Sequence, residues 1–162
     1  SAIARGAAMT DVSAGRAPRA IAIPLPRGSM LTAGVPICYE LLFPNLDRRF
    51  VRDGGQALLA ITNDAWYGRT GAPDQFLVMT AFRAAENRTW VARAANTGVS
   101  AFIDDRGRVQ MQTDLFEQPL LVADLPLRAG GSFYTRHGDW LPLAASIGVA
   151  ALAVAGRVRR RS

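Results

Sequence analysis

Cys38 is the only cysteine of the 162-residue chain, and its surroundings suit a nucleophile. A single cysteine in an apolar run is usually a small buried hydrophobe. Here, however, the apolar run 34–39 predicts a buried strand, and a helix is predicted to begin a few residues later. The start of that helix would favour the thiolate. We therefore expect a nucleophilic cysteine at the end of a strand.

Polar and aromatic residues follow Cys38 and also follow the next predicted strand, residues 57–62. Strand ends that meet at one edge of a sheet commonly form a pocket, so we expect both groups to line one. Glu40 could instead cap a helix or pair with an arginine. Asn63 and Asp64, the polar pair after the second strand, could be turn residues. Trp66 and Tyr67, the aromatic pair, could belong to the core. The candidate pocket residues are Tyr39, Glu40, Asn63, Asp64, Trp66 and Tyr67.

The elements that must position these side chains alternate between strand and helix. Residues 1–30 are rich in alanine, glycine, proline and arginine, which predicts an irregular segment with one short strand at 20–23. Helices are predicted at 43–55 and 72–88, with Pro44 and Pro73 near their starts. Such an order fits a layered α/β domain. The other strands are predicted at 89–95, 99–104, 108–112 and 120–127.

The second predicted helix carries Val78, Ala81, Phe82 and Ala85 at helical spacing on one face. Glu86 lies one turn from Phe82 on the same side. We expect Glu86 to be half-buried and paired with a cation. It would then support the structure rather than take part in the chemistry.

Four short motifs carry a family resemblance: "CYE", "NDAWYG", "RAAEN" and "ANTG", in this order. Together they resemble the nitrilase, or carbon–nitrogen hydrolase, superfamily. Within it the chain is most similar to the apolipoprotein N-acyltransferase branch, because "FYTRHGDW" precedes an apolar run in that branch. The resemblance extends from about residue 21 to the C-terminus.

The resemblance implies an α/β fold in which residues 31–138 form the C-terminal half of a four-layer αββα sandwich. It also implies a catalytic glutamate, lysine and cysteine, of which the cysteine corresponds to Cys38. The glutamate and lysine should lie upstream, yet the chain has no lysine, and its first acidic residue is Asp11. We therefore expect the chain to be part of a longer protein and to be inactive on its own.

The segment 139–157 is apolar on all sides and is followed by the basic tail 158–162. A buried core helix is one explanation of this segment. A transmembrane helix is the other, because the segment is nearly long enough to cross a bilayer and ends in arginines. The arginines would place the C-terminus in the cytoplasm. The catalytic domain would then be periplasmic, at the inner membrane of a bacterium.

The resemblance implies a reaction and its partners. A fatty acyl group would pass from a phospholipid, through a Cys38 thioester, to the N-terminal α-amino group of an apolipoprotein's diacylglyceryl-cysteine. With one histidine and one cysteine we expect no metal site, and no cofactor is expected. The net charge of +6 comes without the motifs of nucleic-acid binding. The alternatives are a soluble amidase or nitrilase and a catalytically inactive, membrane-tethered binding domain.

Overall fold

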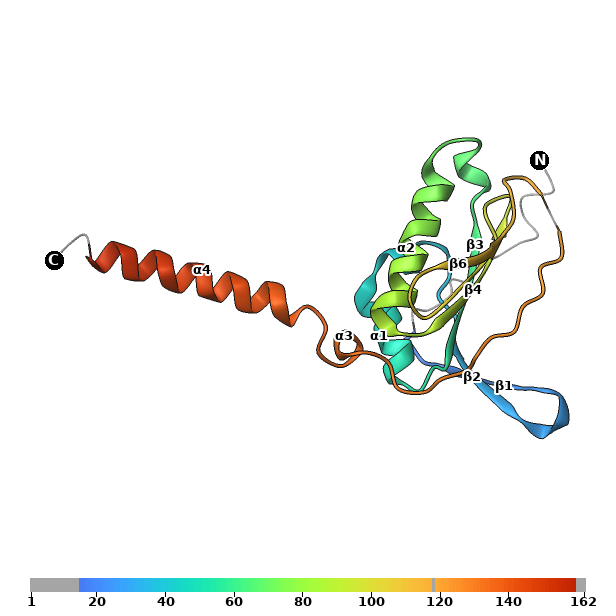
Figure 1. The fold of residues 1–162 in the computed structure, drawn as a ribbon, viewed down its shortest axis with the longest axis horizontal. Coiled ribbons are helices and arrows are strands. Elements are labelled where there is room, and N and C mark those ends of the chain that lie inside the picture. Colours follow the sequence, from blue (N-terminus) through green and yellow to red (C-terminus); the bar gives the residue numbers. More distant parts are fainter. Residues whose placement is uncertain (1–14, 118, 160–162) are drawn as a thin grey trace, which may run out of the picture.

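A six-stranded mixed sheet forms the centre of the molecule (Figure 1). The computed structural model describes residues 15–117 and 119–159. The three strands β2, β3 and β4 run parallel, and the outer strands pair antiparallel with their neighbours. In chain order and in spatial order the strands are β1 (Ile21–Pro24), β2 (Met30–Gly34), β3 (Ala57–Asn63), β4 (Trp90–Asn96), β5 (Ala101–Ile103) and β6 (Val109–Gln112).

Two helices connect the parallel strands, as parallel pairing requires. Helix α1 (Pro44–Arg52) leads from β2 to β3, and α2 (Ala72–Asn87) leads from β3 to β4. Both begin with proline in the first turn, as predicted. They pack on one face of the sheet, where alternate strand residues such as Leu58, Ala60 and Val91 are buried in the core.

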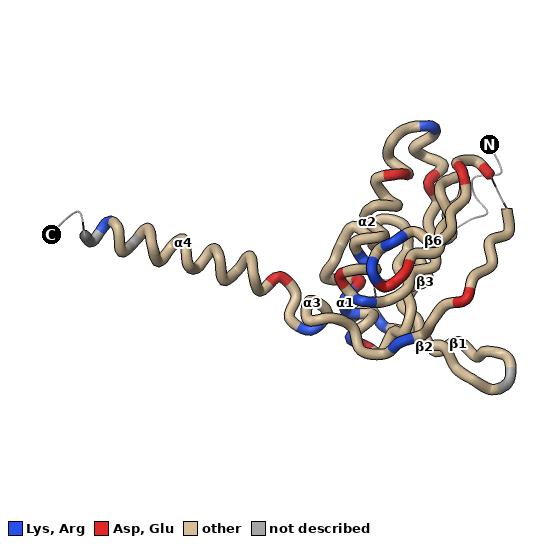
Figure 2. The backbone as a smooth tube through the Cα atoms, in the orientation of Figure 1, with Lys and Arg blue, Asp and Glu red and all other residues tan. Residues whose placement is uncertain are grey.

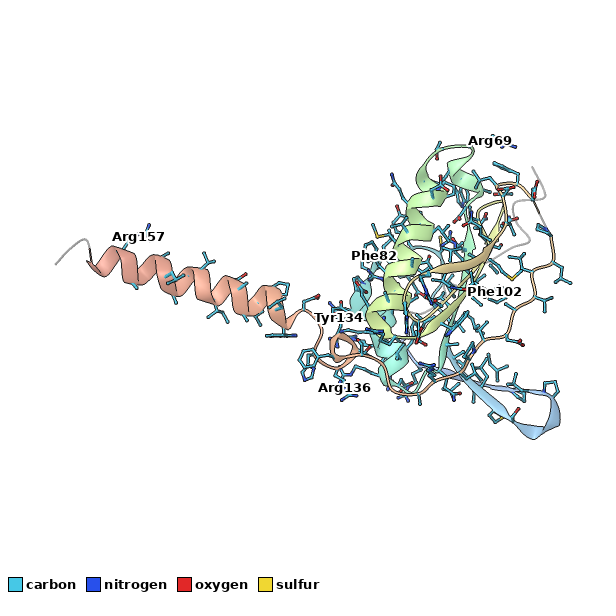
Figure 3. All side chains as sticks on the ribbon, viewed as in Figure 1. Arg69, Phe82, Phe102, Tyr134, Arg136 and Arg157 are labelled. Carbon is cyan, nitrogen blue, oxygen red and sulfur yellow. The ribbon has the colours of Figure 1, made fainter. Side chains whose placement is uncertain are left out.

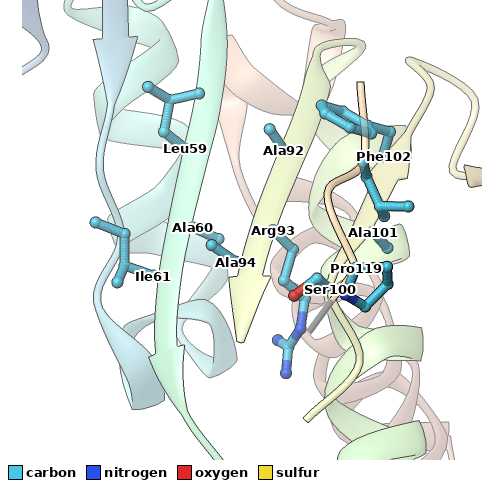
Figure 4. Close-up of a pocket in the computed structure, with 11 residues that line it drawn as sticks. Leu59, Ala60, Ile61, Ala92, Arg93, Ala94, Ser100, Ala101, Phe102 and Pro119 are labelled. Atoms are coloured by element: carbon cyan, nitrogen blue, oxygen red, sulfur yellow. The ribbon is translucent and has the colours of Figure 1, made fainter. Parts of the chain in front are cut away.

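The opposite face of the sheet is only partly covered. The apolar side chains Leu59, Ala92 and Phe102 line a cavity of about 320 Å³ on this face (Figure 4). Ile61, in the middle of the sheet, is 54% exposed. Within the part of the chain that the structure describes, no helix lies on this side, and only the segment 119–127 runs past it (Figure 1).

The strand predicted at 120–127 is absent, which corrects the sequence prediction. The described residues 119–127 run extended but pair with no strand. Pro119 and Pro126 each remove a backbone donor, and Leu120 and Val122 point into solvent. An alternating apolar pattern alone could not reveal that this segment has no partner strand.

The apolar face predicted for α2 is also not the face that packs on the sheet. Val78 and Phe82 are exposed, whereas the buried face carries Thr80, Arg83 and Asn87 among its apolar residues. Thr80 and Asn87 form hydrogen bonds to backbone carbonyls of the same helix, and Arg83 Nη2 pairs with Glu86. The sequence pattern missed this face because polar residues interrupt it.

Two helices follow the sheet. The short helix α3 (Phe133–His137) packs against α1 and α2, and α4 (Trp140–Arg159) projects away from the α/β body (Figure 1). Arg157 lies near the far end of α4, and Arg136 lies at its base (Figure 3). Helix α1 is tied to this junction by Asn45, whose Nδ2 donates to Asp139 Oδ2 over 3.3 Å. Arg48 Nη1 also donates to the Thr135 carbonyl over 3.3 Å.

Candidate active site

Cys38 lies in a turn beyond strand β2 rather than inside a strand. Strand β2 ends at Gly34, and Ile37 then makes one isolated parallel bridge to Ile61. Cys38 begins the short 3₁₀ helix η3 (Cys38–Leu42) with a φ of 53°. A non-glycine residue in this left-handed region costs about 1–3 kcal/mol and persists only where its surroundings fix it. A strained turn between strand and helix is how many hydrolases expose a nucleophile.

Glu40 holds this turn through the backbone. Its Oε2 accepts the Ile37 N–H over 2.7 Å, and its own N–H donates to the Ile37 carbonyl over 3.1 Å. These bonds connect the two residues on either side of the Cys38–Tyr39 pair. The carboxylate of Glu40 therefore acts first on the geometry of the thiol turn, which agrees with the capping alternative.

We expect Glu40→Ala to loosen the thiol turn and lower the free energy of unfolding by about 1 kcal/mol, as for other lost helix caps. Glu40→Gln keeps an acceptor for the Ile37 N–H and should lose less than half of that. Urea unfolding of both variants measures the difference. Equal loss in the two variants would show that the negative charge, and not the hydrogen bond, holds the turn.

An aromatic group lies beside the thiol turn. The buried Phe76 of α2 makes an edge contact with Tyr39, with ring centres 5.7 Å apart, and a tilted contact with Tyr67 at 5.4 Å. Tyr67 belongs to the short helix η4 (Ala65–Tyr67) that follows β3. Desolvation, then Tyr39, Cys38 and Asp64, raise the pKa of Tyr67.

The structure therefore brings Cys38, Tyr39 and Tyr67 together. Trp66 lies in the same η4 segment, but its side chain is 84% exposed, so it is not a core residue. Asn63 is exposed at the end of β3, and its Oδ1 accepts from the Ala65 N–H over 3.2 Å. This bond is typical of a turn residue.

Asp64 points into the protein instead of into a pocket. It is buried, and its Oδ1 accepts from the Thr62 hydroxyl over 2.8 Å. Its Oδ2 forms an ion pair of 2.6 Å with Arg93 Nη2. Both carboxylate oxygens are thus occupied, so Asp64 supports the loop after β3 and does not offer itself to a substrate.

Arg93 is a residue that the sequence prediction missed. The segment "TWVARAA" has the pattern of a strand, and Arg93 shares its inward face with Val91. An arginine at an inward position needs a buried carboxylate, because an unpaired charge there is costly. This need for a buried carboxylate was the feature of the sequence from which the pair could have been predicted. Asp64, at the end of the neighbouring strand, supplies the carboxylate.

Glu86 lies at the junction of α2 and α3. Its Oε1 pairs with Arg83 Nη2 at 3.2 Å, and it is half-buried. Its backbone carbonyl accepts a hydrogen bond from the Ser132 hydroxyl, at the start of α3. Burial raises the pKa of Glu86, and Arg83 opposes this effect. The contacts of Glu86 are those of a supporting residue.

A second buried carboxyl faces the same arginine. Asp47 of α1 is fully buried, and neither of its side-chain oxygens has a hydrogen-bond partner among the described residues. Burial raises the pKa of Asp47 to about 8; Arg83 lowers it, and Glu40 and Glu86 raise it further. Tyr134 lies at this junction, where α3 meets the other helices (Figure 3). We call Asp47, Arg83 and Glu86 the α1–α2 polar cluster.

Comparison with known protein families shows to which family the chain belongs. The sequence model of the carbon–nitrogen hydrolases matches residues 12–134. The chain belongs to the carbon–nitrogen hydrolase family. The matched residues include the thiol turn, the aromatic group and the Asp64–Arg93 ion pair.

Curated relatives of this carbon–nitrogen hydrolase chain are named apolipoprotein N-acyltransferase. The protein of Geobacter metallireducens is 48% identical over 123 residues, which cover 74% of this chain and 24% of the relative. The protein of Chlorobaculum tepidum is 44% identical over 126 residues, covering 77% of this chain and 24% of the relative. The chain thus spans about a quarter of the relatives' length. These matches confirm the resemblance seen in the sequence motifs.

Solved structures of carbon–nitrogen hydrolases share the fold. An amidase from Nesterenkonia sp. AN1 matches with a TM-score of 0.53 and 26% identity over 71% of this chain and 45% of the amidase. A carbon–nitrogen hydrolase from Helicobacter pylori matches with a TM-score of 0.53 and 11% identity over 64% and 41%. The nitrilase-type α/β fold is confirmed, and the described residues form one sheet with helices on one face.

Proposed function

We propose that the chain carries the nucleophile and part of the substrate pocket of an apolipoprotein N-acyltransferase. One observation carries the proposal: the only thiol of the chain lies in a left-handed turn beside exposed aromatic rings. A buried filler cysteine has no need of such a turn. The similarity to the named relatives supports this choice among the reactions of the family.

The reaction has two steps at Cys38. The thiolate attacks the ester carbonyl of a phospholipid, a C–S bond forms, and the lysophospholipid alkoxide leaves and takes up a proton. The α-amino group of a diacylglyceryl-cysteine then attacks the thioester, an amide forms, and the thiol is released. The Tyr39 N–H, next to the nucleophile, donates to the developing oxyanion.

The resemblance implies an upstream glutamate as the acid–base group and a lysine that stabilises the oxyanion, but neither can be assigned to a position of this sequence, which contains no lysine. General acid–base catalysis typically contributes about 10²–10⁴-fold, and an oxyanion donor contributes a comparable factor. We therefore propose that the chain alone has little or no turnover, although its thiol can still be modified.

The aromatic group supplies apolar surface for the acyl chain. Tyr39 is 55% exposed, and Trp66 extends further into solvent. Tyr39 and Tyr67 both contact the buried Phe76. Aromatic rings with a polar edge suit the boundary between an acyl chain and a headgroup. Asn63 and Glu40 add polar groups next to this surface. The buried Asp64 supports the loop 63–67 from inside the protein.

We also propose that α4 spans the bacterial inner membrane, with the α/β body periplasmic and the C-terminus cytoplasmic. Among the described residues α4 is long and apolar enough to cross a bilayer, and none of the window Trp140–Arg157 is buried. Figure 2 shows no charge between Asp139 and Arg157. At about 1.5 Å per residue the 20-residue helix is roughly 30 Å long, and its uncharged part, residues 140–156, covers about 25 Å of a hydrocarbon core roughly 30 Å thick. A buried core helix would instead pack on the sheet.

Extraction with alkaline carbonate tests the membrane proposal. We expect the chain to stay in the membrane pellet, whereas Ile147→Arg, which puts a charge at the helix centre, should be released in part. A central arginine disfavours insertion by about 2.5–3.5 kcal/mol. Ile147→Val is the matched control and should behave as the unchanged chain. Release of the unchanged chain would favour the soluble amidase or nitrilase.

A chimera tests the reaction. Residues 12–134 of this chain replace the matching segment of the Geobacter metallireducens relative, and transfer from labelled phospholipid to a diacylglyceryl peptide is measured. We expect a labelled thioester on Cys38 and a labelled N-acyl peptide. A folded, membrane-inserted chimera that releases free fatty acid would support a hydrolase. One that binds phospholipid without product would support the inactive binding domain.

A further inference from the structure

Arg93 joins four parts of the fold through one buried guanidinium. The residue is 3% exposed in the middle of β4. Its Nη2 reaches Asp64 after β3 at 2.6 Å, and its Nη1 donates to the Thr80 hydroxyl of α2 over 3.2 Å. Its Nε donates to the Val99 carbonyl in the loop before β5 over 3.1 Å. Each nitrogen therefore fixes a different element.

Phe76 connects this guanidinium to the thiol turn. The Arg93 Cζ lies 6.0 Å from the centre of the Phe76 ring, within the range of a cation–π contact. The same ring contacts Tyr39, which follows Cys38, and Tyr67, which follows β3. Arg93 thus lies next to the Phe76 ring, which contacts both the thiol turn and the segment after β3.

Asp64 transmits the same constraint to the backbone of the loop 63–67. Its N–H donates to the Asn96 carbonyl over 3.3 Å, and its carbonyl accepts from the Tyr67 N–H over 3.1 Å. A Cβ at Gly98 would overlap the Asp64 carboxylate, so only glycine allows the turn after β4 to approach so closely. The buried Asp64–Arg93 ion pair is therefore closely packed against the turn after β4.

We propose that Arg93 is a positioning residue of the candidate active site, which sets the placement of the thiol turn relative to the loop 63–67. The proposal rests on Cys38 being the reactive thiol of the proposed function. Replacing a buried ion pair by apolar residues of similar volume is often neutral or stabilising. Stability alone therefore does not explain the pair, whereas the fixed geometry of two adjoining site segments does.

Electrostatics agree with this geometry. Burial lowers the pKa of Arg93, and both Asp64 and the Cys38 thiolate oppose that effect. The thiolate therefore lies within the field of the guanidinium. Loss of Arg93 should change the orientation of the thiol.

The experiment follows the alkylation of Cys38, the only thiol, by iodoacetamide between about pH 6 and pH 10 in the full chain in mild detergent. The main variant is the double substitution Arg93→Met/Asp64→Leu, which removes both buried charges together. Phe76→Leu leaves the ion pair intact and removes the ring between it and Tyr39. Thr135→Val is the control, because it removes a buried hydroxyl that bonds to Asn87 in another part of the fold.

We expect the double variant to unfold near the temperature of the unchanged chain, yet its limiting alkylation rate should fall about tenfold because the thiol is no longer held in place. Phe76→Leu should lower the limiting rate in the same direction. Thr135→Val should lose stability but keep the profile. A profile within about twofold of the unchanged chain in the double variant, or in Phe76→Leu, would overturn the proposal. Alkylation needs no acyl donor, so failure of acyl transfer in the chimera is a separate result.

Discussion

Replacing Cys38 by alanine in the chimera should abolish the labelled thioester and lower acyl transfer by at least about 10³-fold, the scale seen when other enzymes lose a nucleophile. The sequence offers no second thiol. Cys38→Ser should be nearly as inactive, because a hydroxyl needs a base to become a nucleophile, whereas a thiol is partly ionised near neutral pH. Transfer from labelled phospholipid, followed by gel analysis of the acyl-enzyme, measures both variants.

The left-handed turn supplies a matched control for folding. Cys38→Gly also lacks a nucleophile, but glycine adopts a φ of 53° without strain. We therefore expect Cys38→Gly to be at least as stable as Cys38→Ala and equally inactive. An acyl-thioester or undiminished transfer in any of the three variants would show that the nucleophile is another group.

The α1–α2 polar cluster should make the protein less stable as the pH rises. Asp47 keeps its proton in the folded protein up to a pKa of about 8, whereas in the unfolded chain its pKa is near 3.8. Between these values the unfolded state releases the proton first, so the free energy of unfolding falls with rising pH. Below about pH 4 both states are protonated and the contribution of Asp47 is fully present.

Asp47→Asn should remove this dependence. The amide stays neutral at every pH, so the variant should be more stable than the unchanged chain by about 5 kcal/mol near pH 8 and nearly equal to it at pH 4. Urea unfolding in mild detergent at a series of pH values measures the difference between the two. Asp74→Asn, at an exposed site in the first turn of α2, is the control and should change stability little. A parallel pair of curves for Asp47→Asn and the unchanged chain would show that Asp47 is ionised in the fold.

The order of elements around the site followed from local patterns, because each is short and clearly bounded. The helices at Pro44 and Pro73 and the strand before Asn63 all form within a few residues of their predicted bounds. The turn at Cys38 could not be predicted. Its apolar run looks the same as a strand, and a left-handed φ depends on Glu40 fixing the backbone of Ile37.

Long-range pairing accounts for most of what the sequence did not reveal. Asp64 looks like a turn residue until Arg93, 29 residues later, is placed opposite it. The sequence around Asp47 shows no unusual pattern, because Asp47 is buried by elements that become neighbours only in the fold. Such residues depend on which elements become neighbours, and periodicity along one element carries no information on that.

Under the proposed function, helix α1 would influence how a lipid substrate reaches Cys38. It begins directly after the segment η3 that starts at Cys38, and near that same end Asn45 is bonded to Asp139, the residue before α4. In a chain anchored by α4, helix α1 and its Asn45–Asp139 hydrogen bond would therefore connect the thiol turn to the membrane helix. Under the proposed function, a donor or acceptor that stays in the bilayer would have to present its reactive group at the height of Cys38 above the membrane, so the reach of the substrate headgroup would become part of its selection.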